Sequence, residues 1–135
     1  MDKKRFLLAS AAYVVMVMVI ATAWHIGLFK DVYADARIRE QPLFHLGIAS
    51  IVSRALVVAY VYPLCSLSGS PVARGLKFGL LTGLLLGSYG VLAEAGKYDV
   101  GPVPTFLFYE GAFFAIQYSL VGIAVGLIYG QTQLR

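Results

Sequence analysis

Residues 75–87 read GLKFGLLTGLLLG, with a glycine at every fourth position of a stretch that otherwise has the composition of a helix. In water, each glycine inside a helix costs about 1 kcal/mol relative to alanine, so four of them would weaken the segment. In a lipid bilayer, helices gain nothing by hiding apolar side chains from the lipid tails, and they associate through close backbone packing instead. The spacing therefore predicts a membrane helix that lies very close to a neighbour through four residues: Gly75, Gly79, Gly83 and Gly87.

The composition agrees with a membrane protein. Of the 135 residues, 59% are hydrophobic and 13% are charged, and the mean hydropathy is +0.77, which is far from the mixture of a soluble domain. Four apolar runs, each long enough to cross the roughly 30 Å hydrocarbon layer, account for it: residues 6–29, 44–67, 76–93 and 106–129. We predict an all-α integral membrane protein, a single domain over residues 1–135, folded as an up-down-up-down four-helix bundle.

The first run also resembles a cleavable signal peptide. Lys3-Lys4-Arg5 precedes it, and Ala21-Thr22-Ala23 matches an A-x-A cleavage site. The run continues through Trp24 to Phe29, beyond that site, which favours an uncleaved signal anchor.

The basic residues predict the orientation of the chain. A cluster that precedes the first span is typical of a cytoplasmic N-terminus. With both termini in the cytoplasm, six basic residues lie inside and four outside: Lys3, Lys4, Arg5, Arg74, Lys77 and Arg135 against Lys30, Arg37, Arg39 and Lys97. The net charge of +4 then reflects contact with anionic lipid, and no basic cluster with interleaved aromatic residues indicates nucleic acid.

The last run carries its own series of small residues: Gly111, Ala115, Ser119, Gly122 and Gly126. Two such stripes are typical of tight helix packing, as in a glycine zipper. We favour packing of the third run on the fourth within one chain. Contact with another subunit, or with a lipid or a flat pigment-like cofactor, is the alternative; no cofactor is otherwise indicated.

Arg54 stands out because it lies about 15 Å into the second run by helix rise. Insertion of an arginine at that depth costs roughly 2.5 to 3.5 kcal/mol, so an inward orientation and a partner are expected. Glu110 is the best candidate, and Gln117 shares its helical face. The predicted intramembrane polar cluster comprises Arg54, Glu110, Gln117, Tyr118 and Ser50. We favour a lock on helix register over a transport site for an anion, proton or substrate.

His25 and His45 fall at the outer ends of two adjacent predicted spans. Two imidazoles at similar depth are compatible with a metal or a haem. Interfacial histidines beside aromatic residues are more often anchors in the headgroup region, which is the interpretation we favour.

Motifs typical of enzymes are absent from the sequence. There is no GxSxG, Walker or HExxH motif. A single cysteine, Cys65, excludes an intrachain disulfide. The charged loop that contains Tyr33 is predicted to be solvated, with a lipid-headgroup surface as the alternative.

The basic start, the four spans, WHIG near the end of the first span, the glycine-spaced third span and the closing VGLIYG resemble small four-span bacterial membrane proteins grouped as a domain of unknown function. The resemblance covers most of the chain. It implies a location in the bacterial inner membrane and supplies no catalytic residue.

Three functions follow as hypotheses. The first is a non-enzymatic accessory or structural subunit that packs through its glycine-rich faces in a larger membrane complex or a homo-oligomer. The second is a small transporter or channel with a midplane site at Arg54 and Glu110. The third is a haem- or metal-binding membrane enzyme that uses His25 and His45.

Overall fold

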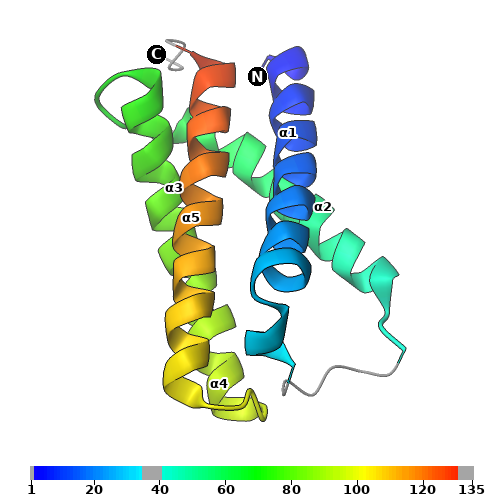
Figure 1. Cartoon of the computed structure of the whole chain (residues 1–135). Helices are drawn as coiled ribbons and strands as arrows, with labels where there is room; N and C mark the ends of the chain where they lie inside the picture. The colour runs from blue at the N-terminus through cyan, green and yellow to red at the C-terminus, as the bar shows by residue number, and fades with distance from the viewer. Residues whose placement is uncertain (1, 35–40, 131–135) are drawn as a thin grey trace.

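The computed structural model describes residues 2–34 and 41–130, and all regular structure in these two ranges is helical. In chain order the elements are α1 (Lys3–Thr22), η1 (Ala23–Leu28), η2 (Lys30–Tyr33), α2 (Phe44–Val61), η3 (Tyr62–Leu64), α3 (Pro71–Gly87), η4 (Ser88–Ala93), α4 (Glu94–Lys97) and α5 (Val103–Tyr129). Figure 1 shows α1, α3 and α5 as long helices that run roughly alongside one another, with α2 crossing obliquely behind them.

Four continuous helical segments are long and apolar enough to cross a membrane, which confirms the number of predicted spans: Lys3–Leu28, Phe44–Leu64, Pro71–Lys97 and Val103–Tyr129. The third begins five residues earlier than predicted. The Ser70 hydroxyl accepts a hydrogen bond from the backbone N–H of Ala73, and Pro71 occupies the first helical position, where its missing N–H is not needed. The up-down-up-down order relative to a bilayer and the cytoplasmic termini remain predictions.

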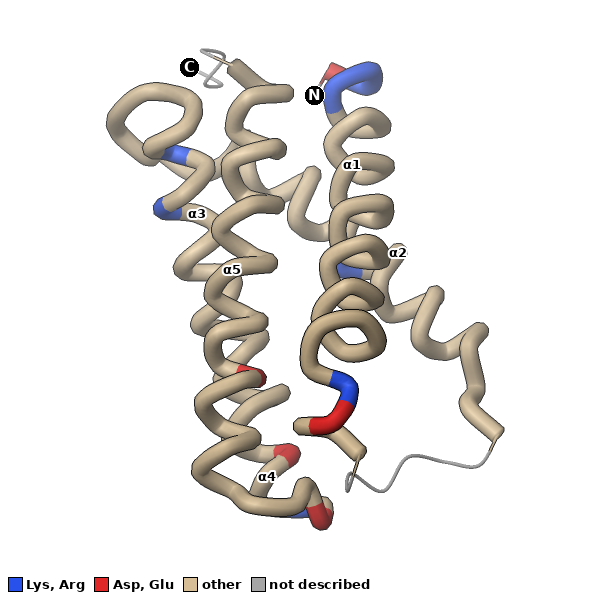
Figure 2. Tube along the Cα trace, in the orientation of Figure 1, with Lys and Arg blue, Asp and Glu red and all other residues tan. Residues whose placement is uncertain are grey.

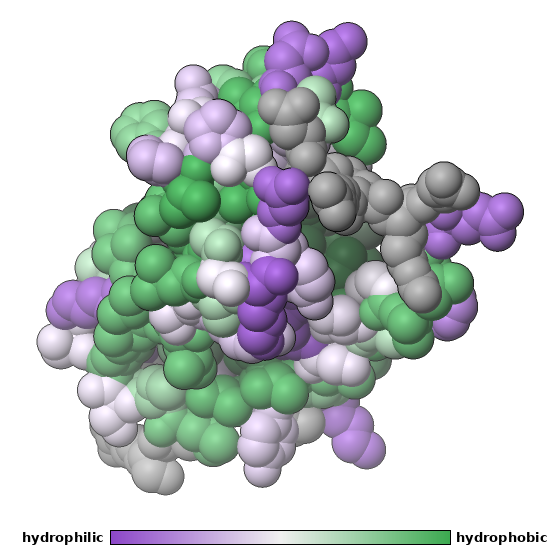
Figure 3. All heavy atoms as spheres, turned by 90° about the horizontal axis from the view of Figure 1, so that it is seen from below, coloured by the Kyte–Doolittle hydropathy of each residue, from purple (hydrophilic) through white to green (hydrophobic). Residues whose placement is uncertain are grey.

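The flanks of the helices carry large exposed apolar side chains. Phe44, Leu84 and Leu85 are each more than 70% exposed, and Figure 3 shows wide continuous areas of hydrophobic residues beside hydrophilic ones. A soluble monomer rarely exposes so much contiguous apolar surface. The surface therefore suits a protein surrounded by lipid.

Glycines bring α3 and α5 into backbone contact. A Cβ added to Gly75 would meet the carbonyl oxygen of Gly122, and one added to Gly79 would meet the carbonyl oxygen of Tyr118. On α5, a Cβ on Gly126 would meet the carbonyl oxygen of Pro71. These glycines therefore form a contact between two helices of the same chain, because a side chain at any of these positions would push α3 and α5 apart.

Not every predicted small residue shares in this contact. Gly111 has no atom within 4 Å of an added Cβ, Ala115 is exposed, and Ser119 is half-buried. A Cβ on Gly83 would meet chiefly the Tyr118 side chain, with the Phe114 carbonyl oxygen at 3.4 Å, and one on Gly87 would meet the Phe114 side chain. The closest approach is therefore confined to the half of α5 that contains Gly122 and Gly126, and the helices diverge beyond it because aromatic rings lie between them.

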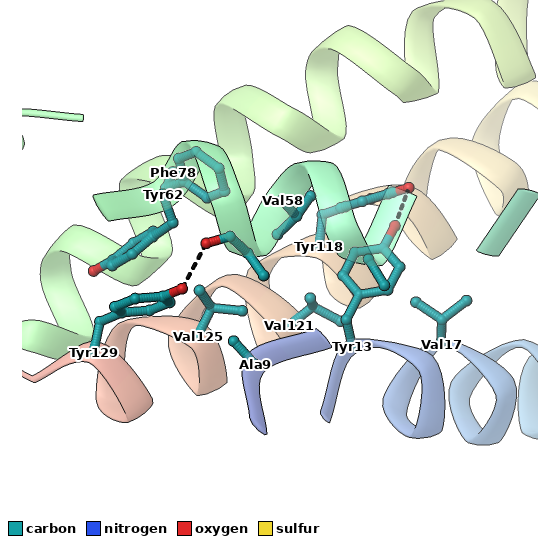
Figure 4. Close-up of a cluster of buried hydrophobic side chains, with 12 residues drawn as sticks. Ala9, Tyr13, Val17, Val58, Tyr62, Phe78, Tyr118, Val121, Val125 and Tyr129 are labelled. Atoms are coloured by element: carbon teal, nitrogen blue, oxygen red, sulfur yellow. Dashed lines mark hydrogen bonds between the residues drawn. The ribbon is translucent and has the colours of Figure 1, made fainter. Parts of the chain in front are cut away.

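The buried core lies where α1, α2 and α5 meet. Tyr13, Tyr118 and Val125 are at most 1% exposed, and small residues such as Ala9 and Ala59 let the helices approach around them. Figure 4 shows three tyrosine hydroxyls that form hydrogen bonds within this core: those of Tyr13 and Tyr118 with each other, and that of Tyr129 with the Ala59 carbonyl oxygen.

Contacts near both ends show that α1 and α5 run in opposite directions. The Arg5 guanidinium donates to the Tyr129 carbonyl oxygen at 2.9 Å, and His25 contacts Glu110 near the other end. Arg74 also donates to the Gly130 carbonyl oxygen. Cations at a helix C-terminus satisfy its free carbonyls and complement its dipole.

Basic residues gather at the end of the molecule where α1 begins (Figure 2), namely Lys3, Lys4, Arg5, Arg74 and Lys77. At the opposite end, Lys30 and Lys97 are accompanied by acidic residues. The other basic residues used for the predicted orientation, Arg37, Arg39 and Arg135, lie outside the described residues.

Removal of the hydroxyl group is expected to change the free energy of unfolding differently for two tyrosines near the junction of α2 and α5. The Tyr129 hydroxyl donates to the Ala59 carbonyl oxygen at 2.6 Å, so Tyr129→Phe should lower the free energy of unfolding by about 1 kcal/mol. The Tyr62 hydroxyl is buried without a hydrogen-bond partner in the described chain, so Tyr62→Phe should be neutral or stabilising. Denaturant titration in detergent micelles checks both variants, and equal losses would contradict this account.

Candidate functional site

A hydrogen-bonded network joins the C-terminal end of the first span to the N-terminal half of the last span. The Glu110 carboxylate, 9% exposed, accepts from the Tyr33 hydroxyl at 2.9 Å and contacts the His25 Nε2 at 3.1 Å, both through Oε2. The Trp24 Nε1–H donates to the Tyr33 hydroxyl at 3.0 Å. Four side chains from η1, η2 and α5 therefore form one connected polar cluster: Trp24, His25, Tyr33 and Glu110. We call it the outer network because it lies at the end of the molecule opposite the start of α1, whatever its side of the membrane.

The contacts of His25 determine how many protons this network holds. Its Nδ1 lies 3.0 Å from the Ala21 carbonyl oxygen, which can only accept, so Nδ1 carries a hydrogen. The hydrogen bond between Nε2 and Glu110 then needs one further proton, carried either by His25 or by Glu110.

Tyr33 stays protonated in this arrangement. Burial, together with the negative charge of Glu110, raises the pKa of Tyr33 well above its usual range. Because the Tyr33 oxygen accepts from Trp24, its own hydrogen is available to Glu110. Tyr33 is thus an anchor of the outer network, and its placement differs from the solvated loop predicted from the sequence.

A π-helical turn positions the two residues from the first span. Trp24 and His25 both lie in η1, where the wider turn changes the direction of successive side chains relative to α1. The His25 ring packs edge-on to Phe113 at a centroid distance of 4.5 Å, and Trp24 packs on Phe29 at 4.4 Å. Aromatic rings therefore shield the network from one side.

Arg54 contacts a different polar group, halfway along the helices. Its Nη1 donates to the Tyr118 hydroxyl at 3.1 Å, and the Tyr118 hydroxyl lies 3.2 Å from that of Tyr13. Its Nε donates to the Ser50 carbonyl oxygen at 3.3 Å. Arg54 is half-buried, and no carboxylate among the described residues lies within ion-pair distance of it.

The ion pair predicted between Arg54 and Glu110 is therefore not formed. Tyr118 follows Glu110 by eight residues on α5, a separation of about 12 Å by helix rise. In Figure 1, α2 runs obliquely behind the other helices, so depth counted along α2 does not match depth along α5. His25 contacts Glu110 in place of Arg54, because η1 lies directly against this part of α5.

The other residues of the predicted polar cluster do not gather around Arg54 and Glu110 either. Tyr118 binds Arg54 as expected, whereas Ser50 is exposed and contributes only its carbonyl oxygen. Gln117 is 2% exposed, and its Oε1 has no hydrogen-bond partner in the described chain. The sequence did not single out Tyr13; its hydroxyl becomes recognisable only once α1 is placed beside α5.

The two histidines are not brought together. His45 is exposed at the start of α2, while both ring nitrogens of His25 already have hydrogen-bond partners. No group of three His, Cys, Asp or Glu side chains in residues 2–34 and 41–130 is arranged to hold a metal ion. Ligation of a metal or haem by His25 would require the outer network to open.

A groove of about 480 Å³ separates α2 from α3 and contains Arg54 in its wall. The α2 backbone approaches α1 closely but barely approaches α3, whereas α3 packs along α5. The rest of the lining is mostly apolar and includes Val57 and Val61 from α2, Cys65 directly after η3, and Phe78, Leu81 and Leu85 from α3. Its polar side chains besides Arg54 are Ser53 and Thr82. Burial raises the pKa of the Cys65 thiol, so this cysteine behaves as a neutral, weakly polar wall residue.

Comparison with known proteins provides no relative. No protein-family model matches the chain, and no curated protein or solved structure is significantly similar to it. The function must therefore be inferred from the geometry of the chain itself.

Proposed function

We propose that the protein is a non-enzymatic accessory subunit of the membrane, and that it holds another membrane component against the flank formed by α2 and α3. The observation that carries this proposal is the groove between these helices, whose described lining is mostly apolar and has Arg54, a half-buried cation, as its one charged residue. A cation in the wall of an open, mostly apolar groove is typical of a binding surface, because a closed hydrophobic core would leave its charge buried without a partner.

This surface replaces the one predicted from the glycines. Gly75, Gly79 and Gly122 meet backbone of the same chain, which supports an internal glycine zipper between α3 and α5 and leaves these residues unable to dock a partner. The flank of α2 has no comparable neighbour, because α2 approaches α3 only weakly. Any docking of a larger complex or of a second copy is therefore proposed at α2 and α3.

Orientation and location belong to the same proposal. Five basic residues at the end where α1 begins, against Lys30 and Lys97 at the other end, support an up-down-up-down bundle with cytoplasmic termini. The location proposed here, a bacterial inner membrane, rests on the sequence pattern alone, because no family model matches the chain.

A blocking substitution in the groove tests the proposed function. Val57 and Val19 are 60% and 61% exposed on α2 and α1, and only Val57 lines the groove. We expect Val57→Trp to reduce the recovery of a larger assembly from native membranes at least tenfold, whereas Val19→Trp should leave it unchanged, because tryptophan would occupy the groove only in the first variant. The mass of the complex in nanodiscs, measured for both variants beside the unmodified protein, is the readout. An unchanged mass for Val57→Trp would refute docking at this flank.

A further inference from the structure

The charge of Arg54 is not neutralised within the described part of the chain. Its guanidinium donates to two neutral oxygens, the Tyr118 hydroxyl and the Ser50 carbonyl, and it borders a mostly apolar groove. Hydroxyl and carbonyl oxygens satisfy N–H donors, but they do not balance a full positive charge in a medium of low dielectric constant. The groove therefore favours an occupant that brings a negative charge to this position.

The depth of Arg54 restricts where that negative charge can come from. Its partner Tyr118 lies 15 residues after the start of α5 and 11 before its end, or about 22 and 16 Å by helix rise. Lipid phosphates lie at the surfaces of the bilayer, beyond the hydrocarbon layer of roughly 30 Å. A carboxylate carried on a membrane-spanning helix reaches the required depth, whereas a lipid headgroup in its ordinary position does not.

A second copy of this chain is a poor source of the charge. The acidic residues in the described ranges lie near the ends of the helices: Asp2, Asp31, Glu94, Asp99 and Glu110. The deepest of them, Glu110, is already bound by His25 and Tyr33. Symmetric pairing through the groove would instead bring two Arg54 side chains together, and like charges at that depth repel.

We propose that the groove between α2 and α3 receives a transmembrane helix of a different protein, which carries a single carboxylate at mid-depth that pairs with Arg54. This inference rests on the proposed docking function and names the chemistry of the partner. The apolar lining from Val57, Val61 and Leu81 packs against an apolar helix, and Arg54 restricts docking to helices with an acidic residue at matching depth. A charge-assisted hydrogen bond in this setting selects strongly against a neutral residue.

Synthetic helices test the inference with the full-length protein. The probe is a leucine- and alanine-rich transmembrane peptide with one central glutamate, and its matched control carries glutamine at the same position. Both peptides carry an acceptor dye and are titrated in phosphatidylcholine vesicles against the unmodified protein. Energy transfer from Trp24, the single tryptophan of the chain, is the readout.

The glutamate peptide is expected to bind at least tenfold more tightly than the glutamine peptide. Arg54→Gln should abolish this preference, Arg54→Lys should keep most of it, and a peptide with glutamate one turn from its end should bind like the glutamine control. Equal binding of both central peptides would overturn the inference. The peptide comparison needs no variant, so it stands even where Arg54→Gln fails to fold.

The outcomes also separate this inference from the proposed function. If both peptides bind equally and Val57→Trp blocks both, docking at the flank stands and the selection by charge is wrong. If neither binds and Val57→Trp leaves the native assembly unchanged, both proposals fail. If native mass spectrometry instead finds an anionic lipid that is retained by the original protein and lost in Arg54→Gln, a lipid occupies the groove and the partner helix is overturned.

Discussion

Replacing Gly122 with alanine is expected to lower the free energy of unfolding by about 3 kcal/mol, at the upper end of the usual effect of overpacking. The added Cβ would lie against the Gly75 carbonyl oxygen and within 2.7 Å of the Gly79 Cα. Both are backbone atoms of α3, and neither can move aside as the end of a flexible side chain can. The helices would have to separate along the closest contact in the fold, with loss of packing over several turns.

The control lies on the same helix. Gly111 has no atom within 4 Å of an added Cβ, so Gly111→Ala should leave the free energy of unfolding nearly unchanged. Titration with a denaturing detergent, followed by circular dichroism, measures both variants under the same conditions. If the two substitutions have the same effect, the contact between α3 and α5 is not the source of stability inferred from the glycines.

Replacing Glu110 with leucine is expected to cost roughly 3 kcal/mol, because the half-buried Tyr33 hydroxyl loses its acceptor and the half-buried His25 loses the partner of its Nε2. The Tyr33 hydroxyl and the His25 Nε2 both depend on Oε2 of Glu110. Glu110→Gln should cost less, since its amide oxygen can still accept the Tyr33 hydrogen. The change is read from unfolding titrations and from the fluorescence of Trp24, the single tryptophan of the chain, which should shift to longer wavelength as the outer network opens.

Glu94 supplies the matched control for this prediction. It is a half-buried carboxyl group at the same end of the molecule, and Tyr33 and His25 bind Glu110 rather than Glu94. Glu94→Leu removes the same charge, so any general benefit to membrane insertion is shared by both variants. A loss for Glu94→Leu as large as that for Glu110→Leu would show that charge at this end matters more than the network.

Much of the fold was predictable because it depends on local properties. The length and hydropathy of each span, the polar turn before Pro71 and the glycine spacing of the third span all follow from residues near one another in sequence. Packing of α3 on α5 was the favoured prediction, and the contacts of Gly75 with Gly122 agree with it. The start of α3 was misplaced because hydropathy ignores the capping of a helix by Ser70.

The polar residues were identified more reliably than their partners. Arg54 and Glu110 were both expected to be held by polar neighbours, and both are. Which neighbour each one meets depends on the inclination of α2 and on the π-helical turn at His25, neither of which has a clear signal in one sequence.

By itself the sequence determined that the chain is helical and that four segments are apolar enough to span a membrane. It also determined that glycine at every fourth position of the third segment allows close backbone contact. These properties are set by local composition and periodicity. Only the tertiary structure decided that the glycines form the contact between α3 and α5 of one chain. It also decided that His25 and Tyr33, rather than Arg54, contact Glu110, and that Arg54 borders an open groove. The physical reason is that the angle between helices, which arises from the packing of bulky side chains against small ones, fixes which polar groups share a depth.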